Sequence, residues 1–287
     1  MEHIDAFRQI ASEATRGELH FPTNVNTSLQ IQSALDDPDC HIDRAQRLVS
    51  AEPLLAARIV AMANSAAYNP GGHEIANIKA AVSRLGFRPL RALVSSMIMR
   101  QFASMLTDPE LRLMAAQLWE HCAQTAGLAY VLSKRITGED PETAFFTGIV
   151  HEVGGFYLFS RAGEFPGIFD SKGEDWRAYG ERAIGRGVMK KLGLPEAVLA
   201  TMEDVWFGAL MLPLVHKDDT EVSQTGNTIL LAKALASTPS PLAPPDQAHL
   251  HGIQGTIDFA CGEGTLQSIL EDARDDVRSL TSALLIT

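Results

Sequence analysis

The sequence predicts an all-α protein, and three observations support that fold class. First, no stretch alternates apolar and polar residues convincingly at the period of two that marks a half-buried strand. Second, apolar residues recur three and four positions apart in successive segments, which places them on one face of a helix. Third, helix start and stop signals flank these segments, so we expect a series of helices joined by loops.

The first half of the chain divides into seven expected helices. Asp5 can cap the first, Pro53 suits the first position of the fourth, and Asn77 can cap the fifth. The fifth ends at Leu85-Gly86, where glycine can adopt the left-handed conformation of a helix C-cap. Thr107-Asp108-Pro109-Glu110 combines a cap, a proline and an acidic first turn, which is a strong helix start. In order, these helices are expected at residues 5–16, 22–35, 43–49, 53–63, 78–85, 89–98 and 109–137.

The central segment, Pro141–Ser160, is apolar on nearly every side. We therefore expect it to form one helix that is buried inside the protein. His151 and Glu152 lie at its middle, and these ionisable side chains must have partners, because an unpaired buried charge is very costly. The groups that pair with His151 and Glu152 determine whether the protein is an enzyme. The remaining helices are expected at residues 176–192, from Pro195 onward, at 228–236 and, after a proline-rich loop, at 265–285.

The charge balance argues against a nucleic-acid-binding protein. The net charge is −11, and binding to a phosphate backbone needs clustered lysine and arginine side chains. No dense basic run exists, and the nearest approach to one is the group Arg84, Arg88, Arg91 and Arg100. Of these, Arg84, Arg88 and Arg91 could bind an acidic partner or a phosphate, although a solvated helix face is the simpler interpretation.

Cysteine usage and the N-terminus both indicate a cytoplasmic protein. Cys40, Cys122 and Cys261 are far apart and show no metal-ligand spacing, so they are expected to be reduced and mostly buried thiols. The N-terminus is acidic where a signal peptide would be basic. The longest apolar stretch, 208–215, is far shorter than the roughly 20 residues that a membrane span needs. We expect no membrane contact and no cofactor.

Seven segments of the chain carry motifs, namely Glu52–Ile59, Met62–Ala66, Ile78–Gly86, Pro89–Arg91, Leu118–His121, Ala144–Gly154 and Gly193–Pro195. Together they resemble the HDOD family of bacterial signalling output domains. The resemblance covers roughly residues 19–236. It implies a non-catalytic regulatory or protein-interaction module, of a kind often coupled to receiver or cyclic-dinucleotide signalling domains. It also implies a relationship to the HD metal-dependent phosphohydrolases.

The HD hydrolase pattern is a His, then His-Asp, then a distant Asp, and these side chains hold a metal that activates water. Here His121 matches the first ligand and His151 the second. Glu152 replaces the first aspartate, and Lys233 stands where the last one would fall. The resemblance therefore implies a vestigial site without catalytic or metal-binding residues. We expect the four side chains to converge, Lys233 to pair with Glu152, and the imidazoles to complete the network.

These inferences predict two helical lobes and a regulatory function. The N-terminal lobe is expected at residues 1–110, a degenerate HD-like lobe at 111–236, and a proline-rich loop with a C-terminal helical extension at 237–287. The extension is expected to pack on one of the lobes. The predicted protein is a non-catalytic regulator in signal transduction. Its partner would be another signalling protein, for example a receiver, a sensor kinase or a cyclic-dinucleotide signalling protein.

Two other classes of function stay open at this point. The first is a metal-dependent phosphohydrolase that uses His121, His151 and Glu152, with Glu203 or Asp204 as a possible fourth ligand. The second is a sensor of a small ligand such as a nucleotide, bound in a pocket between the lobes. Metal content would distinguish the phosphohydrolase from the regulator. A thermal-shift screen of nucleotides would distinguish the sensor from the regulator.

Overall fold

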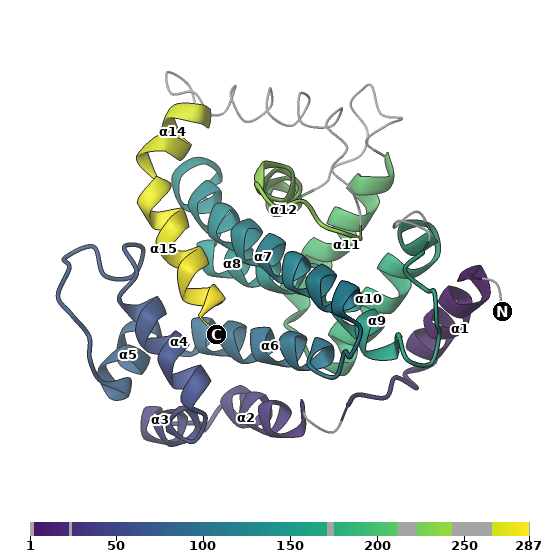
Figure 1. Ribbon diagram of the computed structural model, residues 1–287. Helices are drawn as coiled ribbons and strands as arrows, with labels where there is room; N and C mark the ends of the chain where they lie inside the picture. The colour runs from purple at the N-terminus through teal and green to yellow at the C-terminus, as the bar shows by residue number, and fades with distance from the viewer. Residues whose placement is uncertain (1–2, 23–24, 171–174, 212–222, 243–265, 287) are drawn as a thin grey trace.

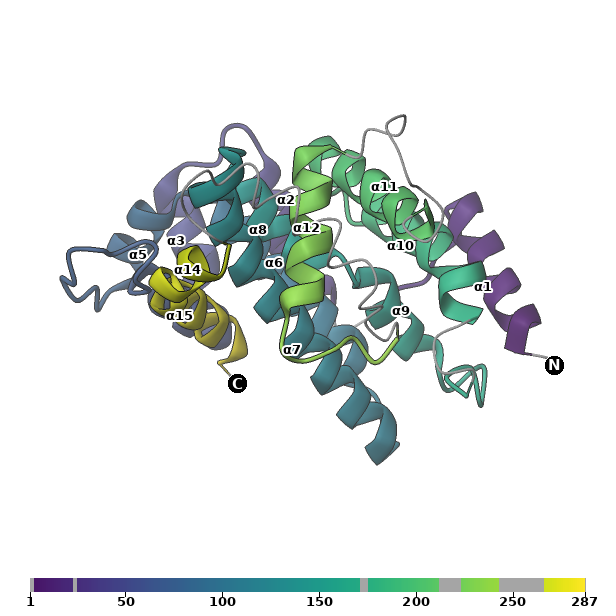
Figure 2. The same ribbon diagram turned by 90° about the horizontal axis from the view of Figure 1, so that it is seen from above.

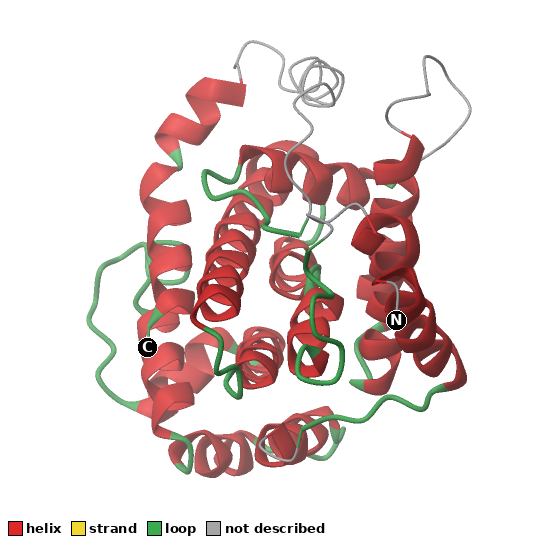
Figure 3. Cartoon of the chain, turned by 45° about the vertical axis from the view of Figure 1, so that its right-hand side comes forward, coloured by secondary structure: helices red, strands yellow, loops and turns green. Residues whose placement is uncertain are grey.

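All regular structure in the described part of the chain is helical, as the sequence predicts (Figure 3). The computed structural model describes residues 3–22, 25–170, 175–211, 223–242 and 266–286. The α-helices are α1 (His3–Arg16), α2 (Asn26–Asp36), α3 (Ile42–Ser50), α4 (Pro53–Ala63), α5 (Ile78–Leu85), α6 (Phe87–Ala103), α7 (Pro109–Leu132), α8 (Pro141–Val150), α9 (Val153–Arg161), α10 (Glu181–Lys191), α11 (Glu196–Met211), α12 (Gln224–Leu235), α14 (Leu266–Asp272) and α15 (Arg274–Leu285). Two short π-helical turns are η2 (Ser133–Thr137) and η3 (Trp176–Gly180).

Local chemistry sets several helix starts as predicted. The Asp108 carboxylate accepts hydrogen bonds from the amides of Glu110 and Leu111 and so caps α7. The Asn77 side chain accepts a hydrogen bond from the Ala80 amide at 2.8 Å and caps α5. Pro53 lies in the first turn of α4, where its missing N–H costs nothing. The caps at Asn77 and Asp108 and the helix start at Pro53 are therefore confirmed.

The expected single helix Pro141–Ser160 is wrong, because the chain breaks at His151 and Glu152. Glu152 has φ −104° and ψ 20°, outside the α-helical region, and its carbonyl accepts the Phe156 amide to begin α9. The His151 ring bonds to the Gly148 carbonyl, the group that a continuous helix would pair with the Glu152 amide. Both side chains thus lie at a helix break rather than in mid-helix.

Other boundaries differ by a few residues. The first helix begins at His3, so Asp5 lies in its first turn rather than at its cap. The second begins at Asn26 instead of residue 22, and the sixth begins at Phe87 rather than at Pro89. Helix α12 begins at Gln224 rather than at residue 228, because the Ser223 hydroxyl caps it. The final helix is interrupted at Ala273, whose φ of −99° and ψ of 6° separate α14 from α15.

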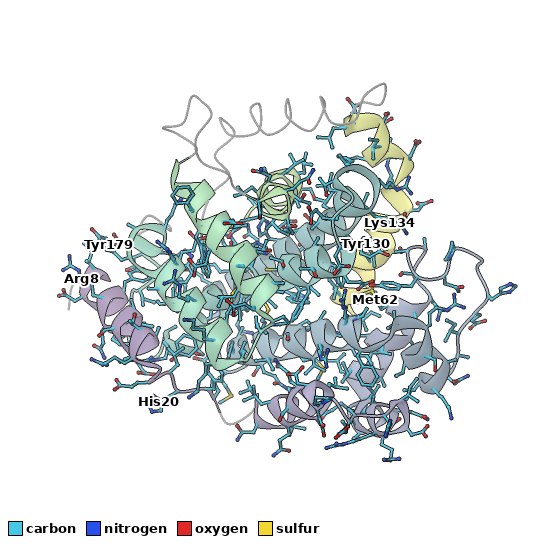
Figure 4. The ribbon with its side chains drawn as sticks, turned by 180° about the vertical axis from the view of Figure 1, so that it is seen from behind. Arg8, His20, Met62, Tyr130, Lys134 and Tyr179 are labelled. Atoms are coloured by element: carbon cyan, nitrogen blue, oxygen red, sulfur yellow. The ribbon has the colours of Figure 1, made fainter. Side chains whose placement is uncertain are left out.

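Helix α7 runs through the centre of the molecule, with α8, α12 and α15 packed around it (Figure 1). Helix α6 packs against α8 and α9, and α2, α3, α4 and α5 lie on its outer side. Helix α1 packs against α10 and η3, where Arg8 lies 5.6 Å above the centre of the Tyr179 ring (Figure 4). The division into lobes near residue 110 stays a prediction, and the packing of α1 crosses that boundary.

The C-terminal helix α15 packs on both α7 and α4, so it bridges the two expected lobes instead of joining one. Its anchor is the Ile286 carbonyl, which accepts hydrogen bonds from Arg58 Nη2 at 2.9 Å and from Arg100 Nη1 at 3.2 Å. The Arg58 side chain is fully buried, and both guanidinium groups lie about 6 Å from the centre of the Trp119 ring. Helix α15 is therefore part of the core.

The structure also bears on the predictions about the cysteines and about membrane-spanning segments. Cys40 and Cys122 are free and buried, as expected, and Cys261 lies outside the described residues. None of the helices in the described parts of the chain combines the length and the hydropathy needed to cross a lipid bilayer.

We expect Gly86→Val to destabilise the protein by more than about 1 kcal/mol, because Gly86 has φ 72° and ψ −175°. The positive φ was predicted, but this ψ belongs to a region essentially restricted to glycine rather than to the left-handed helical region. Chemical denaturation checks the change. Gly163→Val is the matched control, because no atom lies within 4 Å of the added Cβ and φ is not positive there. Equal stability of the two variants would contradict the prediction.

Candidate functional site

The four side chains predicted to converge meet in one buried cluster. His121 comes from α7, His151 and Glu152 from the break between α8 and α9, and Lys233 from α12. One potential ligand atom from each of His121, His151 and Glu152 lies within 4.8 Å of the other two. Lys233 Nζ lies 3.2 Å from Glu152 Oε1. The predicted pairing of Lys233 with Glu152 is therefore present.

Close packing of α8 on α7 brings the two histidines together. Gly148 allows this approach, because a Cβ there would lie 2.6 Å from Ala126 Cα on α7. The ring centres of His121 and His151 are 5.2 Å apart, with the ring planes at 63°. The helix break then turns Glu152 into the same space. Local backbone features of α8 thus build half of the cluster.

Backbone carbonyls determine which nitrogen of each imidazole carries hydrogen. His151 Nδ1 lies 2.8 Å from the Gly148 carbonyl, and His121 Nδ1 lies 2.9 Å from the Thr238 carbonyl. A carbonyl only accepts, so both Nδ1 atoms donate and both Nε2 atoms carry lone pairs. Neither Nε2 atom has a hydrogen-bond partner among the described residues. The cluster thus directs two unpartnered acceptor nitrogens inward.

Burial keeps both imidazoles neutral. The pKa of His151 is well below its ordinary value because of burial, and the Lys233 ammonium and His121 lower it further. Burial also lowers the pKa of His121, although the Glu152 carboxylate acts in the opposite direction. Neutral histidines cannot compensate the negative charge of a carboxylate, so the compensating positive charge next to Glu152 comes from Lys233.

Lys233 lies between two carboxylates. Its Nζ is 3.9 Å from Glu181 Oε1 in addition to the 3.2 Å contact with Glu152 Oε1. Burial alone would lower the pKa of Lys233, but the Glu152 and Glu181 carboxylates raise it, so the amine stays an ammonium. Burial raises the pKa of Glu181, and Lys233 opposes that shift. One ammonium therefore lies between two buried acidic side chains.

Sequence reasoning missed Glu181, the first residue of α10. A signal was available, because Glu181, Ile184 and Val188 are spaced three and four residues apart on one buried face. An acidic residue on an apolar helix face requires a partner. Thr238 was missed as well, and it contributes only a backbone carbonyl, which no side-chain pattern reveals.

A divalent cation does not fit this donor set. Two imidazole nitrogens and one carboxylate are ordinary ligands for a transition metal. However, the Lys233 ammonium already contacts the carboxylate that the cation would need. A dication at that place would face an adjacent positive charge in a buried environment, where charge repulsion is strong. The residues present thus suit an internal ammonium and not a metal.

The other candidate residues lie away from the cluster and are bound elsewhere in the fold. Glu203 pairs with Arg182 and Arg186, and the Asp204 carboxylate accepts the Ser223 amide at 3.3 Å. Neither acid belongs to the group of possible metal ligands, so the proposed fourth ligand is not supplied by them. The three arginines also have partners within the chain: Arg84 with the Tyr68 carbonyl at 3.3 Å, Arg88 with Asp140 at 2.8 Å, and Arg91 with Asp36 at 2.7 Å.

Within the described residues, the fold is helical throughout and of the HD/HDOD-like kind. A solved structure from Shewanella amazonensis SB2B, named "Putative metal-dependent phosphohydrolase", matches 99% of this chain and 100% of its own, with TM-score 0.72 and 19% identity. The sequence model of the HDOD domain matches residues 21–169. The chain belongs to the HDOD domain family. The matched residues include His121, His151 and Glu152, whereas Lys233 lies beyond them.

Two further proteins are similar to this chain. An uncharacterized protein from Treponema pallidum (strain Nichols) is 26% identical in an alignment of 190 residues that covers 61% of this chain. This chain spans only 35% of the length of that relative. A solved structure from Marinobacter aquaeolei VT8, named "Putative signal transduction protein", has TM-score 0.58 and 16% identity. That match covers 99% of this chain and 66% of the other.

Proposed function

We propose that this chain is a non-catalytic regulator that acts in signal transduction by binding another protein. The observation that carries the proposal is the contact of 3.2 Å between Lys233 Nζ and Glu152 Oε1. HD-type hydrolysis needs a metal that lowers the pKa of bound water and polarises a phosphoryl oxygen. In this chain an ammonium contacts the carboxylate that such a metal would need as a ligand, and an ammonium performs neither task.

The proposed regulatory role has two supports besides the site. The chain belongs to the HDOD domain family, and a neighbour with the same fold is named as a signal transduction protein. The chain also carries a net charge of −11, which disfavours nucleic acid as the partner. A protein partner is therefore the class that we propose, within a signalling pathway.

One observation favours the phosphohydrolase as a second candidate. His121, His151 and Glu152 alone form a compact group of possible metal ligands, and an Nε2 atom on each histidine and Glu152 Oε2 have no hydrogen-bond partner among the described residues. If Lys233 lost its proton or moved away, this group could accept a cation. The experiment that separates the two functions must therefore measure both metal binding and turnover.

We expect no hydrolysis of cyclic dinucleotides or nucleoside phosphates by the purified protein in the presence of Mn²⁺ or Mg²⁺. Lys233 stands where the HD pattern has an aspartate, so one metal-binding carboxylate is missing. Its ammonium also places a positive charge next to Glu152. Product formation is measured by chromatography, and bound metal by elemental analysis after dialysis against Mn²⁺. The double variant Glu152→Asp with Lys233→Asp is the matched comparison, because it restores the acids of the HD pattern and is expected to retain Mn²⁺. Turnover by the unaltered protein that His151→Ala abolishes would overturn the proposed function.

A further inference from the structure

A surface groove lies where α6 ends and α7 begins, opposite the end of α9 and the turns that follow it. It encloses about 500 Å³. Its floor is formed by buried apolar side chains from α6, α9 and the following turns, namely Phe102, Phe159, Phe165 and Ile168. The N-terminal end of α7, which forms one wall, extends past the neighbouring helices (Figure 2). The groove is separate from the cluster around Glu152.

Flexible apolar side chains line the edge of this groove. Met105 is 71% exposed, and Leu106, Leu111 and Met114 are half-buried. Exposed apolar surface beside a concave site is typical of a binding surface. Unbranched methionines adapt their shape to a bound apolar group, which suits such a surface. The hydrophobic component of a ligand would thus be held by Met105 and Met114 over the aromatic floor.

All described charged residues that line the groove are acidic. Among its described lining residues, Asp108, Glu110 and Asp170 are acidic, and none is lysine, arginine or histidine. Asp108 is engaged in capping α7. The carboxylates of Glu110 and Asp170 form no ion pair with a described residue. A complementary ligand therefore carries positive charge next to an apolar group, which disfavours nucleic acids and anionic lipids.

We propose that this groove is the partner-binding site, and that it binds a segment of another protein in which apolar side chains are flanked by lysine or arginine. The proposal rests on the proposed function as a protein-interaction module. An apolar anchor inserted over Phe102 and Phe159 would supply most of the affinity, because buried anchors dominate interface energetics. The Glu110 and Asp170 carboxylates would select basic flanks and accelerate association.

The first test uses a fluorescent amphipathic peptide of leucine and lysine at helical spacing, with fluorescence anisotropy as the measurement. We expect binding that Met105→Lys weakens about tenfold or more, as loss of an interface anchor does. Leu113→Lys is the matched control, because Leu113 is also 71% exposed but does not line the groove. Glu110→Lys is compared with Glu196→Lys, since both acids lie in the first turn of a helix and only Glu110 faces the groove.

Circular dichroism melts establish that each variant folds. Loss of binding with Met105→Lys and Glu110→Lys, but not with the two controls, supports the groove. The proposal would be overturned by any of three results. The peptide does not bind, a variant and its control have equal effects, or a peptide with glutamate in place of lysine binds equally well.

A second test separates this inference from the proposed function. A photo-crosslinking residue is placed at Met105, at Leu113 or at Glu196 in cells that produce the protein, and the captured segments are sequenced. We expect capture only at Met105, through a segment that joins apolar residues to lysine or arginine. Capture only at another position would overturn the groove but leave a protein-binding function intact. Absence of capture at every position would count against both.

Discussion

Lys233→Ala is expected to destabilise the protein by about 3–5 kcal/mol, because removal of one partner of a buried ion pair leaves the other charge uncompensated. The Lys233 side chain is only 18% exposed, and Glu152 is 1% exposed. Without the ammonium, the Glu152 carboxylate would face two neutral histidines that offer lone pairs rather than hydrogens. Chemical denaturation monitored by circular dichroism measures the loss.

Companion variants show whether charge or packing causes this loss. Lys233→Met keeps much of the side-chain volume, so it should cost less than Lys233→Ala. Combining Lys233→Met with Glu152→Gln removes both charges and should recover part of the stability. Lys190→Ala is the control for loss of an exposed lysine from a helix. A Lys233→Ala variant as stable as the Lys190→Ala control would show that the ion pair has no structural role.

Gly148→Ala is expected to cost about 1–3 kcal/mol, even though alanine is favoured over glycine in a helix by about 1 kcal/mol. The added Cβ would lie 2.6 Å from Ala126 Cα and 2.9 Å from its amide nitrogen. These are backbone atoms of α7, so relief requires α8 to move away. That movement would also displace His151, whose ring is held by the Gly148 carbonyl at 2.8 Å.

The comparison for this variant is Gly71→Ala, where the added Cβ would meet only the His73 side chain at an ordinary 3.6 Å. Denaturation gives the stability of both variants, and the histidine ring resonances in an NMR spectrum report on the cluster. Gly148→Ala should alter the His121 and His151 resonances, whereas Gly71→Ala should not. A stable Gly148→Ala variant with unaltered ring resonances would contradict close helix packing as the reason for glycine.

Helix boundaries were predictable where one or two neighbouring residues decide them. Asp108 and Asn77 cap helices through their own side chains, and such contacts depend on local sequence alone. The break after Val150 was not predictable from periodicity, because a segment apolar on every side carries no information about its phase. The break depends on a histidine ring bonding to a backbone carbonyl, which composition does not reveal.

The site was predictable where the resemblance supplied it and unpredictable elsewhere. Lys233 and Glu152 are 81 positions apart, and the HD pattern, rather than any spacing rule, connected them. Glu181 has no counterpart in that pattern, so its contact with Lys233 emerged only from the fold. For Arg84, Arg88 and Arg91 the sequence favoured a solvated face and left an interaction surface open, because their acidic and carbonyl partners within the chain are remote in sequence.

The anchoring of α15 has a consequence for the order of assembly. Arg58 and its acceptor, the Ile286 carbonyl, are 228 positions apart. During synthesis, α4 emerges long before α15 exists, and a lone guanidinium does not enter an apolar interior unpaired. The Arg58 guanidinium also contacts the Ser96 hydroxyl at 3.5 Å, but it gains its carbonyl acceptor only when α15 is in place. A chain cut short before residue 286 is therefore expected to leave the Arg58 guanidinium without this acceptor and in contact with water.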